Sequence, residues 1–526
     1  MIIFWRPKGV ISTQKQHIEM SAPRQNWQSK LGFILAASGS AIGLGNIVFF
    51  SSNAYQYGGG AFYLPYFVAL FVMGMPIMMV EFGLGALTQK SFPMALSQLA
   101  GRRGEFVGWW SIGSALFITM YYIAILGWAL GMMIGAFGSL FQPGATAPFT
   151  PFTEPMPEPN ATVYFFSLIS TWNPLVYIII IWLANLFILR QGTHTIEKAV
   201  RIFVPLMWLF MIILAVRGLT LPGGFDGVMY LFTPALDGIR EPSVWKGAFS
   251  QMFFSLSLGL GTMTAYASYL PKDADQVNNS MLVSFLNCSF EFLAGVAIFS
   301  LLFVFALNPA GTTLSLSFFV IPQGINELST VPWIVRLFGF LFYLLVVLAG
   351  ITSSISLIEA PASALIDKFR FSRRKALALI AIPCVMGSCL FALPQIIDPR
   401  LSGNGTLGLT LLDITDHWVF NYSLLTVGLL EVLMIGWVFG AGKLRAALNE
   451  NAKVKLGGWF EILIRYLLPV ILLVVIVTSL AQEWPLYGTS YDMPGYSWLT
   501  MFIPIFWLAF TLFFAFYITR SKTVDP

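Results

Sequence analysis

The sequence predicts an all-α polytopic membrane protein with twelve transmembrane helices. Of its 526 residues, 57% are apolar and only 10% are charged, whereas charged residues make up about a quarter of an ordinary soluble domain. The mean hydropathy is +0.77. The apolar stretches show no period of two, which favours helices over the alternating strands of a membrane barrel.

Twelve segments are long enough to cross a bilayer as a helix, which requires about 20 mostly apolar residues. In chain order they cover residues 29–52, 61–89, 106–139, 173–190, 198–217, 244–270, 279–307, 332–366, 375–396, 418–440, 460–481 and 496–519. We expect four regions: an N-terminal tail at 1–26, helices 1–5 at 27–217, helices 6–10 at 218–440, and helices 11–12 with the C-terminal tail at 441–526.

The basic residues predict the orientation. Twelve crossings place both termini on one side of the membrane. If that side is the cytoplasm, only five of the 29 basic residues remain outside, namely Arg217, Arg240, Lys246, Arg336 and Arg400. This bias follows the positive-inside rule. We therefore expect a multi-pass protein of the inner or plasma membrane with cytoplasmic termini. The net charge of +5 is explained without a nucleic-acid partner.

Two segments outside the helices carry further expectations. Residues 1–26 are polar and basic, so they do not resemble a secretory signal. Met20 opens the short segment 20–27 immediately before helix 1, and we interpret Met20 as the true start, with 1–19 upstream of it. Residues 141–172 are rich in proline and read as an irregular external loop.

Glycine clusters interrupt two helices. Helix 1 contains Gly39, Gly43 and Gly45, and helix 6 contains Gly259 and Gly261. Glycine is common where membrane helices pack closely, and this remains an alternative for either cluster alone. Interruptions at matching positions of two halves are typical of transporter binding sites.

Uncharged polar side chains accompany these glycines at mid-membrane depth. The group comprises Asn46, Ser255, Ser257, Asn287 and the run Thr352-Ser353-Ser354. A polar group without a partner costs several kcal/mol in hydrocarbon. For any one of these residues, a hydrogen bond between helices is the simpler explanation. For the whole set we favour a site for a hard monovalent cation, which prefers oxygen ligands.

These residues resemble the neurotransmitter:sodium symporters, particularly their bacterial leucine-transporter branch. The resemblance rests on Trp27-Gln-Ser-Lys-Leu31-Gly, Gly43-Leu-Gly45-Asn46, Gly58-Gly-Gly60-Ala-Phe62, Gln251-Met-Phe-Phe254-Ser-Leu-Ser257-Leu-Gly259, Tyr266-Ala-Ser-Tyr269, Ala349-Gly-Ile-Thr352-Ser353-Ser354 and Gly436-Trp-Val-Phe-Gly440. They occur in order over nearly the whole chain. The resemblance implies a five-plus-five inverted repeat with broken helices 1 and 6.

The resemblance also implies two sodium sites and a substrate site. The first sodium site would use Ala41, Asn46, Ser255 and Asn287, together with a carboxylate of the substrate. The second would use Gly39, Ile42, Ala349, Thr352 and Ser353. The substrate would contact Ser40, Ala41, Leu44, Gly45, Ile118, Tyr122, Phe254, Ser255, Ser257, Leu260, Ser353 and Leu357. Gly43 replaces the aspartate of monoamine carriers, so the substrate should supply its own carboxylate.

Glu291, with Gln251, matches the chloride-independent members of the family. A carboxylate there would stand in for chloride and would be able to take a proton. The alternative for a single membrane glutamate is a protonated packing residue, although intramembrane carboxylates are usually functional.

The resemblance extends to an inner gate but only partly to an outer one. Arg24, Asp367 and Tyr269 match the inner gate. At the outer gate Phe49 replaces an arginine, while its partner aspartate is retained as Asp416. Three explanations remain open. Phe49 closes the pocket by aromatic packing, another basic group such as the neighbouring histidine reaches Asp416, or tight gating is lost. We favour aromatic packing.

The sequence therefore predicts a sodium-driven symporter of neutral amino acids that works by alternating access, is independent of chloride and binds two Na⁺ ions. Its partners would be the amino acid and the lipid bilayer; the sequence gives no oligomeric state. No nucleophile motif or metal-spaced histidine set indicates an enzyme. Two alternatives stay open: a sodium-dependent amino-acid receptor that does not transport, and a proton-coupled exchanger that uses Glu291.

Overall fold

The computed structural model describes residues 26–138, 140–141, 160–307, 313–394, 407–486 and 497–523, and within these ranges the chain is helical, without strands. Its elements are α1 (Lys30–Ala41), η1 (Gly45–Phe49), α2 (Phe50–Gln56), α3 (Gly60–Ala69), η2 (Leu70–Gly74), α4 (Met75–Thr88), α5 (Phe92–Gly135), α6 (Ala161–Ile169), α7 (Asn173–Leu189), α8 (Thr193–Leu219), α9 (Gly224–Phe232), η3 (Leu236–Arg240), α10 (Pro242–Ser255), α11 (Thr262–Ala267), α12 (Gln276–Val304), α13 (Thr313–Ser315), η4 (Leu316–Val320), α14 (Ile321–Glu327), α15 (Pro332–Phe369), α16 (Arg373–Phe391), α17 (Leu407–Trp418), η6 (Val419–Ser423), α18 (Leu424–Leu433), η7 (Met434–Gly440), α19 (Ala441–Asn451), α20 (Trp459–Ile462), η8 (Leu463–Leu467), α21 (Leu468–Glu483), η9 (Trp484–Leu486) and α22 (Ser497–Arg520).

These elements make the twelve predicted crossings. In the described part of the chain, nine helices are long and apolar enough to span a membrane. Two bent pairs add a span each: α1 with the helix at 45–56, and α6 with α7. The twelfth is helix 6, which is divided into α10 and α11 and is too short on either side of the break to qualify by length. The predicted fold class is confirmed.

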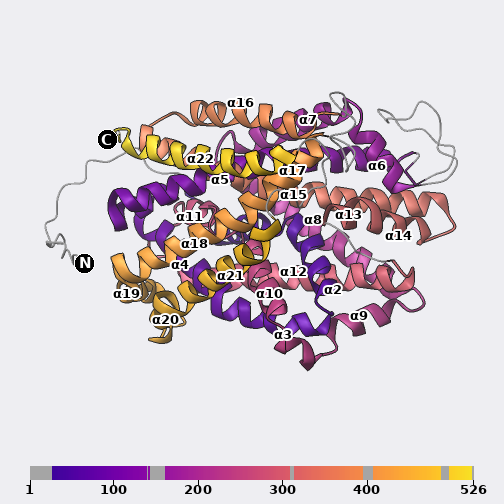
Figure 1. Cartoon of the computed structure of the whole chain (residues 1–526), viewed down its shortest axis with the longest axis horizontal. Coiled ribbons are helices and arrows are strands. Elements are labelled where there is room, and N and C mark those ends of the chain that lie inside the picture. Colours follow the sequence, from indigo (N-terminus) through magenta and orange to yellow (C-terminus); the bar gives the residue numbers. More distant parts are fainter. Residues whose placement is uncertain are drawn as a thin grey trace, which may run out of the picture.

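The helices run along the long axis of the molecule (Figure 1). At one end, on the left of the view, lie α19, α20 and the end of α22. At the opposite end lie α6, the first part of the bent fourth crossing, and α9, α13 and α14, which belong to the connections between crossings. The two ends therefore carry different connecting elements, as expected of a protein inserted in one orientation.

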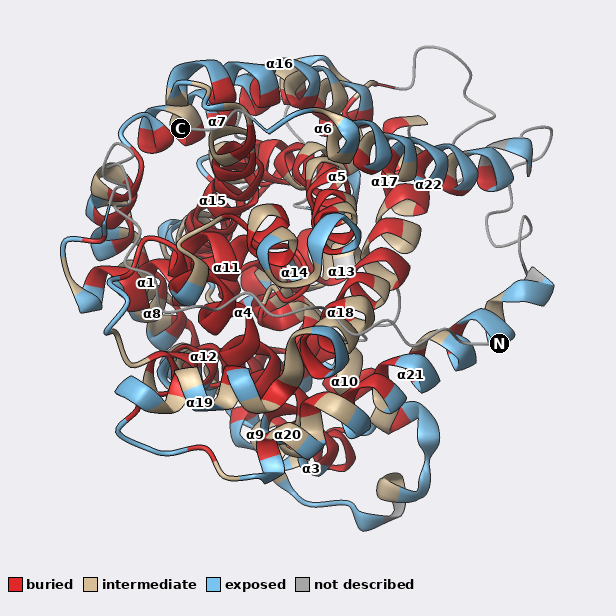
Figure 2. Ribbon diagram, turned by 90° about the vertical axis from the view of Figure 1, so that its left-hand side faces the viewer, coloured by how far each residue is buried: buried red, intermediate tan, exposed pale blue. Residues whose placement is uncertain are grey.

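Burial separates an interior from a lipid-facing surface. Buried residues gather around α5, α11 and α15, whereas the outward sides of α16, α21 and α22 are exposed (Figure 2). The helices α5 and α15 pack along each other. Exposed side chains of the outer helices are apolar, as at Ile505, Phe513 and Tyr517 of α22. An apolar exterior of this kind suits a lipid environment.

Three boundaries differ from the predicted ones. The loop at 141–172 is not irregular throughout, because Asn160 caps α6 by accepting a hydrogen bond from the Val163 amide at 3.0 Å. The third crossing is preceded by a helical segment that turns at Gly101, where φ is 64°. The tenth crossing begins at Leu407, whereas the sequence predicted a start near 418. The predicted start is too late because charged residues in the first turns lower the hydropathy. In the fold these residues line a cavity and do not face lipid.

Candidate substrate and ion site

Both glycine clusters break their helices, as predicted. The first break follows Ala41, and the chain resumes as helix at Gly45 after a bend of 57°. The second break separates Ser255 from Thr262. Gly259 and Gly261 adopt φ values of 74° and 70° there, in the left-handed region that favours glycine.

A carboxylate that the sequence analysis did not single out holds the second break. The Gly259 amide donates to Glu81 of α4 at 2.7 Å, and the Ser111 hydroxyl donates to the Gly259 carbonyl at 2.8 Å. Glu81 is completely buried. A carboxylate inside a membrane helix usually has a functional or structural role, so Glu81 could have been identified from the sequence. Its partner, the Gly259 amide, could not.

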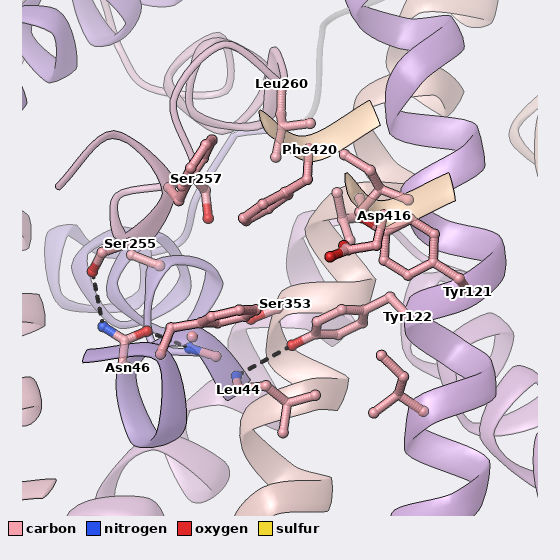
Figure 3. Close-up of a pocket in the computed structure, with 18 of the residues that line it drawn as sticks. Leu44, Asn46, Tyr121, Tyr122, Ser255, Ser257, Leu260, Ser353, Asp416 and Phe420 are labelled. Carbon is pink, nitrogen blue, oxygen red and sulfur yellow. Dashed lines mark hydrogen bonds between the residues drawn. The ribbon is translucent and has the colours of Figure 1, made fainter. Parts of the chain in front are cut away.

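The two breaks face one cavity of about 450 Å³. All twelve residues that the resemblance assigned to the substrate line it: Ser40, Ala41, Leu44, Gly45, Ile118, Tyr122, Phe254, Ser255, Ser257, Leu260, Ser353 and Leu357. Helices 1, 3, 6, 8 and 10 all contribute to its wall, so segments that are far apart in the sequence meet at one place (Figure 3).

Hydrogen bonds connect the first break to helices 3, 6 and 8. The Leu44 amide faces the Tyr122 hydroxyl at 3.5 Å, the outer limit of a hydrogen bond (Figure 3). The Ser40 carbonyl accepts from the hydroxyls of Ser257 at 3.2 Å and Ser353 at 3.1 Å. Ser40 lies directly before the last residue of α1, so its carbonyl oxygen is shared by three crossings at the point where helix 1 ends.

The side chains predicted for the first sodium site form one cluster. The Asn46 amide nitrogen donates to the Asn287 amide oxygen at 2.7 Å and lies 3.1 Å from the Ser255 hydroxyl. The Asn287 amide nitrogen in turn lies 2.5 Å from that hydroxyl. Ala41 lines the same cavity. The cluster is uncharged and rich in oxygen, which suits a hard cation.

Glu291 lies directly behind this cluster. Its carboxylate accepts from the Ser255 hydroxyl at 2.7 Å and from the Gln251 amide at 2.8 Å. The Tyr66 hydroxyl donates to its other oxygen, and the sequence analysis did not identify Tyr66. A single hydroxyl therefore connects a buried carboxylate to the predicted ion ligands.

The residues predicted for the second sodium site meet between helices 1 and 8. The hydroxyls of Thr352 and Ser353 donate to the Ala349 carbonyl at 2.9 and 3.2 Å. Gly39 faces Thr352 so closely that an added Cβ would lie 3.4 Å from the Cβ of Thr352. Ile42 follows the last turn of α1. Gly39 therefore packs against helix 8 at Thr352, and Ile42 marks the end of α1 three residues later.

Comparison with known proteins agrees with this geometry. The model of the sodium:neurotransmitter symporter family matches residues 24–143 and 167–522. The chain belongs to this family. It is similar to an uncharacterised sodium-dependent transporter of Methanocaldococcus jannaschii, with 40% identity over 90% of this chain and 94% of the relative.

Two further matches extend this comparison of the symporter. One is the sodium- and chloride-dependent GABA transporter 2 of Macaca fascicularis, which is 28% identical over 91% of this chain and 83% of its own length. The other is the crystal structure of MhsT in complex with L-phenylalanine, at 28% identity and a TM-score of 0.72, covering 87% of this chain and all of MhsT. Membership of a sodium-dependent transporter family and its helical membrane fold are thus established.

The predicted inner gate lies only partly within the described residues. Arg24 lies outside the described residues, so its pairing with Asp367 stays a prediction. Asp367 accepts from the Ser91 amide at 2.6 Å. The Tyr269 hydroxyl donates to Glu359 at 2.7 Å, and the Trp27 amide donates to the Tyr269 carbonyl at 3.1 Å. Glu359 is a partner of Tyr269 that the sequence analysis did not identify.

Phe49 and Asp416, the residues predicted for an outer gate, both line the cavity. Phe49 stacks on Phe420, a residue of helix 10 that the sequence analysis missed. His417 lies 2.7 Å from Glu483 of helix 11. His417 is thus paired with Glu483 in the described residues, and the hypothesis that it replaces the missing arginine as partner of Asp416 stays a prediction.

Proposed function

We propose that this protein is a secondary active transporter that couples the movement of Na⁺ to the symport of neutral amino acids. The observation that carries the proposal is the single cavity at which two helix breaks, an uncharged oxygen-rich cluster and an apolar wall meet. Family membership and the sodium-dependent relatives support the use of sodium. The complex of MhsT with L-phenylalanine supports an amino acid as the substrate class.

The cavity wall favours a zwitterion with an apolar side chain. Near the first break the wall offers the amides at 44–45 and the Tyr122 hydroxyl, which would receive a carboxylate. The carbonyl oxygens around Ala41 would accept an ammonium group. The remaining wall is apolar at Ile118, Leu260 and Leu357. No carboxylate projects from Gly43, and the carboxylates that line the cavity, Asp413 and Asp416, come from helix 10; at the first break the anionic group would therefore come from the substrate.

Coupling follows if the substrate completes the first ion site. A sodium ion bound by Asn46, Ser255 and Asn287 would gain a ligand from the substrate carboxylate, so each would increase the affinity for the other. A second ion would bind between Gly39 and Thr352. We further propose that two five-helix repeats, 27–217 and 218–440, carry out alternating access.

We also propose that both termini face the cytoplasm. The connections at the end of the molecule that holds α19 and α20 contain basic residues, including Lys443, Arg445 and Lys453. A bias of this kind directs an end of a membrane protein to the cytoplasm.

Glu291 predicts independence of chloride, because a carboxylate beside the ion cluster already supplies a negative charge. In Glu291→Ser, uptake in chloride-free buffer should fall by at least about tenfold, since a charge-assisted hydrogen bond contributes about 1.5–3 kcal/mol. Added chloride should restore uptake, because the shorter side chain leaves space for the anion. Glu291→Gln is the control: it removes the charge but fills the space, so chloride should not rescue it. Equal uptake by Glu291→Ser with and without chloride would contradict this role.

The proposed function is tested by uptake into proteoliposomes that contain the full chain. A pool of labelled neutral amino acids is offered with an inward sodium gradient and, separately, with equal sodium on both sides. Accumulation only with the gradient is the expected result. Saturable sodium-dependent binding without accumulation would instead indicate a receptor. Uptake that follows pH and ignores sodium would indicate a proton-coupled exchanger.

A further inference from the structure

Three phenylalanine rings from three crossings form a continuous stack. Phe420 of η6 stacks on Phe254 of α10 with a centroid separation of 4.2 Å and an interplanar angle of 26°. Phe49 of η1 stacks on Phe420 at 6.1 Å and 19°. These separations suit stabilising aromatic contacts. The middle ring, Phe420, therefore joins helix 10 to helices 1 and 6.

The stack stands between two cavities. A second cavity of about 390 Å³ adjoins it, and its wall includes the polar side chains of Ser52, Gln56, Lys246 and Ser250. The residues shared by both cavities are Gly45, Phe49, Phe254, Ser255, Asp416, Phe420 and Asn421. All three rings therefore lie on the boundary between the two cavities. That boundary also includes Gly45 and Ser255, at the end of the substrate cavity where the carboxylate and the first ion would bind.

The charged groups near this boundary are directed elsewhere. His417 contacts Glu483 at 2.7 Å, and the Lys246 ammonium donates to Gln482 at 3.0 Å. Both partners lie on α21, so the side chains of His417 and Lys246 connect helices 10 and 6 to helix 11. Asp416 lies beside the phenol of Tyr121 (Figure 3). No basic side chain in the described part of the chain forms an ion pair with Asp416.

We propose that Phe49, Phe254 and Phe420 are the outer gate of this symporter, which opens when helix 10 carries Phe420 out of the stack. The proposal rests on the proposed function in taking the 450 Å³ cavity as the substrate cavity. Contacts between aromatic rings do not depend on charge. The gate is therefore independent of ionic strength, unlike an ion pair, whose strength is reduced by salt.

Cysteine accessibility tests the gate without a substrate. Ser356 lines only the substrate cavity of the two, and Ser250 lines only the second cavity. Ser356→Cys and Ser250→Cys are introduced separately into the full chain in proteoliposomes. Their rates of modification by a membrane-impermeant cationic methanethiosulfonate are measured in sodium buffer. The chain without either reporter gives the background of its three native cysteines, of which two are buried and one is half-buried.

Phe420→Leu should raise the modification rate at Ser356→Cys by about three- to tenfold, the factor that loss of an aromatic pair produces. The rate at Ser250→Cys should stay within about twofold. Phe420→Tyr keeps the ring, so its rate at Ser356→Cys should match the parent. An unchanged rate at Ser356→Cys in Phe420→Leu would overturn the gate, and so would an equal rise at both reporters, which indicates general loosening.

A second pair of variants keeps the test decisive if Phe420→Leu does not fold. Phe49→Leu should raise the rate at Ser356→Cys without changing Ser250→Cys. When both Phe49 and Phe420 are leucine, the second substitution should add little, because residues that act through one contact are not additive. Independent, multiplicative effects would contradict a single stack.

The charge requirement is tested by Phe49→Arg. The parent rate at Ser356→Cys, divided by the rate at Ser250→Cys, should not change with ionic strength. In Phe49→Arg this ratio should become dependent on salt, and Asp416→Ala should remove that dependence. A parent ratio that already depends on salt and on Asp416 would overturn the aromatic gate. These modification rates are measured without an amino acid. A result that contradicts the gate proposal is therefore distinguishable from one that contradicts the symport proposal.

Discussion

Asn287→Ala is expected to reduce the apparent sodium affinity by about 10- to 150-fold, which abolishes sodium-dependent amino-acid binding at ordinary concentrations. The substitution removes a completely buried amide that contacts both Asn46 and Ser255. A hydrogen bond or ligand contact to a charged group contributes about 1.5–3 kcal/mol, which corresponds to that range of affinity. The substitution therefore weakens sodium binding directly, and it weakens amino-acid binding because that binding depends on sodium.

The measurement is the sodium-dependent rise in melting temperature of the purified chain, since an ion that binds only the folded state stabilises it by mass action. Asn279→Ala is a matched control on the same helix. Asn279 is buried, and its side-chain oxygen has no hydrogen-bond partner among the described residues. Asn279→Ala should respond to sodium as the parent does. An unchanged sodium response in Asn287→Ala would exclude Asn287 from the first ion site.

The sequence predicted the breaks well because a break is a local property. Gly259 and Gly261 lack a Cβ and occupy the left-handed region, so their clustering was informative by itself. The first turns of helix 10 were missed for a related reason. Hydropathy treats Asp416 and His417 as signals for water, whereas in the fold they face a cavity inside the bundle. A window average cannot distinguish these two environments.

The partners of the site residues could be predicted only where resemblance supplied them. Glu81 and Gly259 are 178 residues apart, and nothing local to either residue indicates the other. The same is true of Tyr66 with Glu291. Phe420 is one of 48 phenylalanines, most of which are expected in packing. Its position in the stack is a consequence of how η6 approaches helices 1 and 6, which depends on the whole bundle.

Loss of the buried ion pair between Glu359 and Arg373 is expected to destabilise the fold strongly. The Glu359 side chain is fully buried and that of Arg373 is 15% exposed. Arg373 donates to both carboxylate oxygens, one of them at 3.1 Å, and the Tyr269 hydroxyl donates to Glu359 as well. Glu359→Ala would leave a guanidinium buried without its counter-charge. The expected cost is about 3–5 kcal/mol of folding free energy.

Glu461→Ala is the matched control, because Glu461 pairs with Arg445 at 2.6 Å while both side chains are about 30% exposed. An exposed pair contributes about 0–1 kcal/mol, so the melting temperature should hardly change. Adding Arg373→Met to Glu359→Ala should recover most of the loss, since the cost comes from the unpaired charge. If both glutamate variants melt alike, the pair at Glu359 is solvated and gives no more stability than a surface contact. If Arg373→Met deepens the loss instead, Arg373 stabilises the fold mainly through its hydrogen bond to the Leu189 carbonyl, at 2.6 Å, rather than through Glu359.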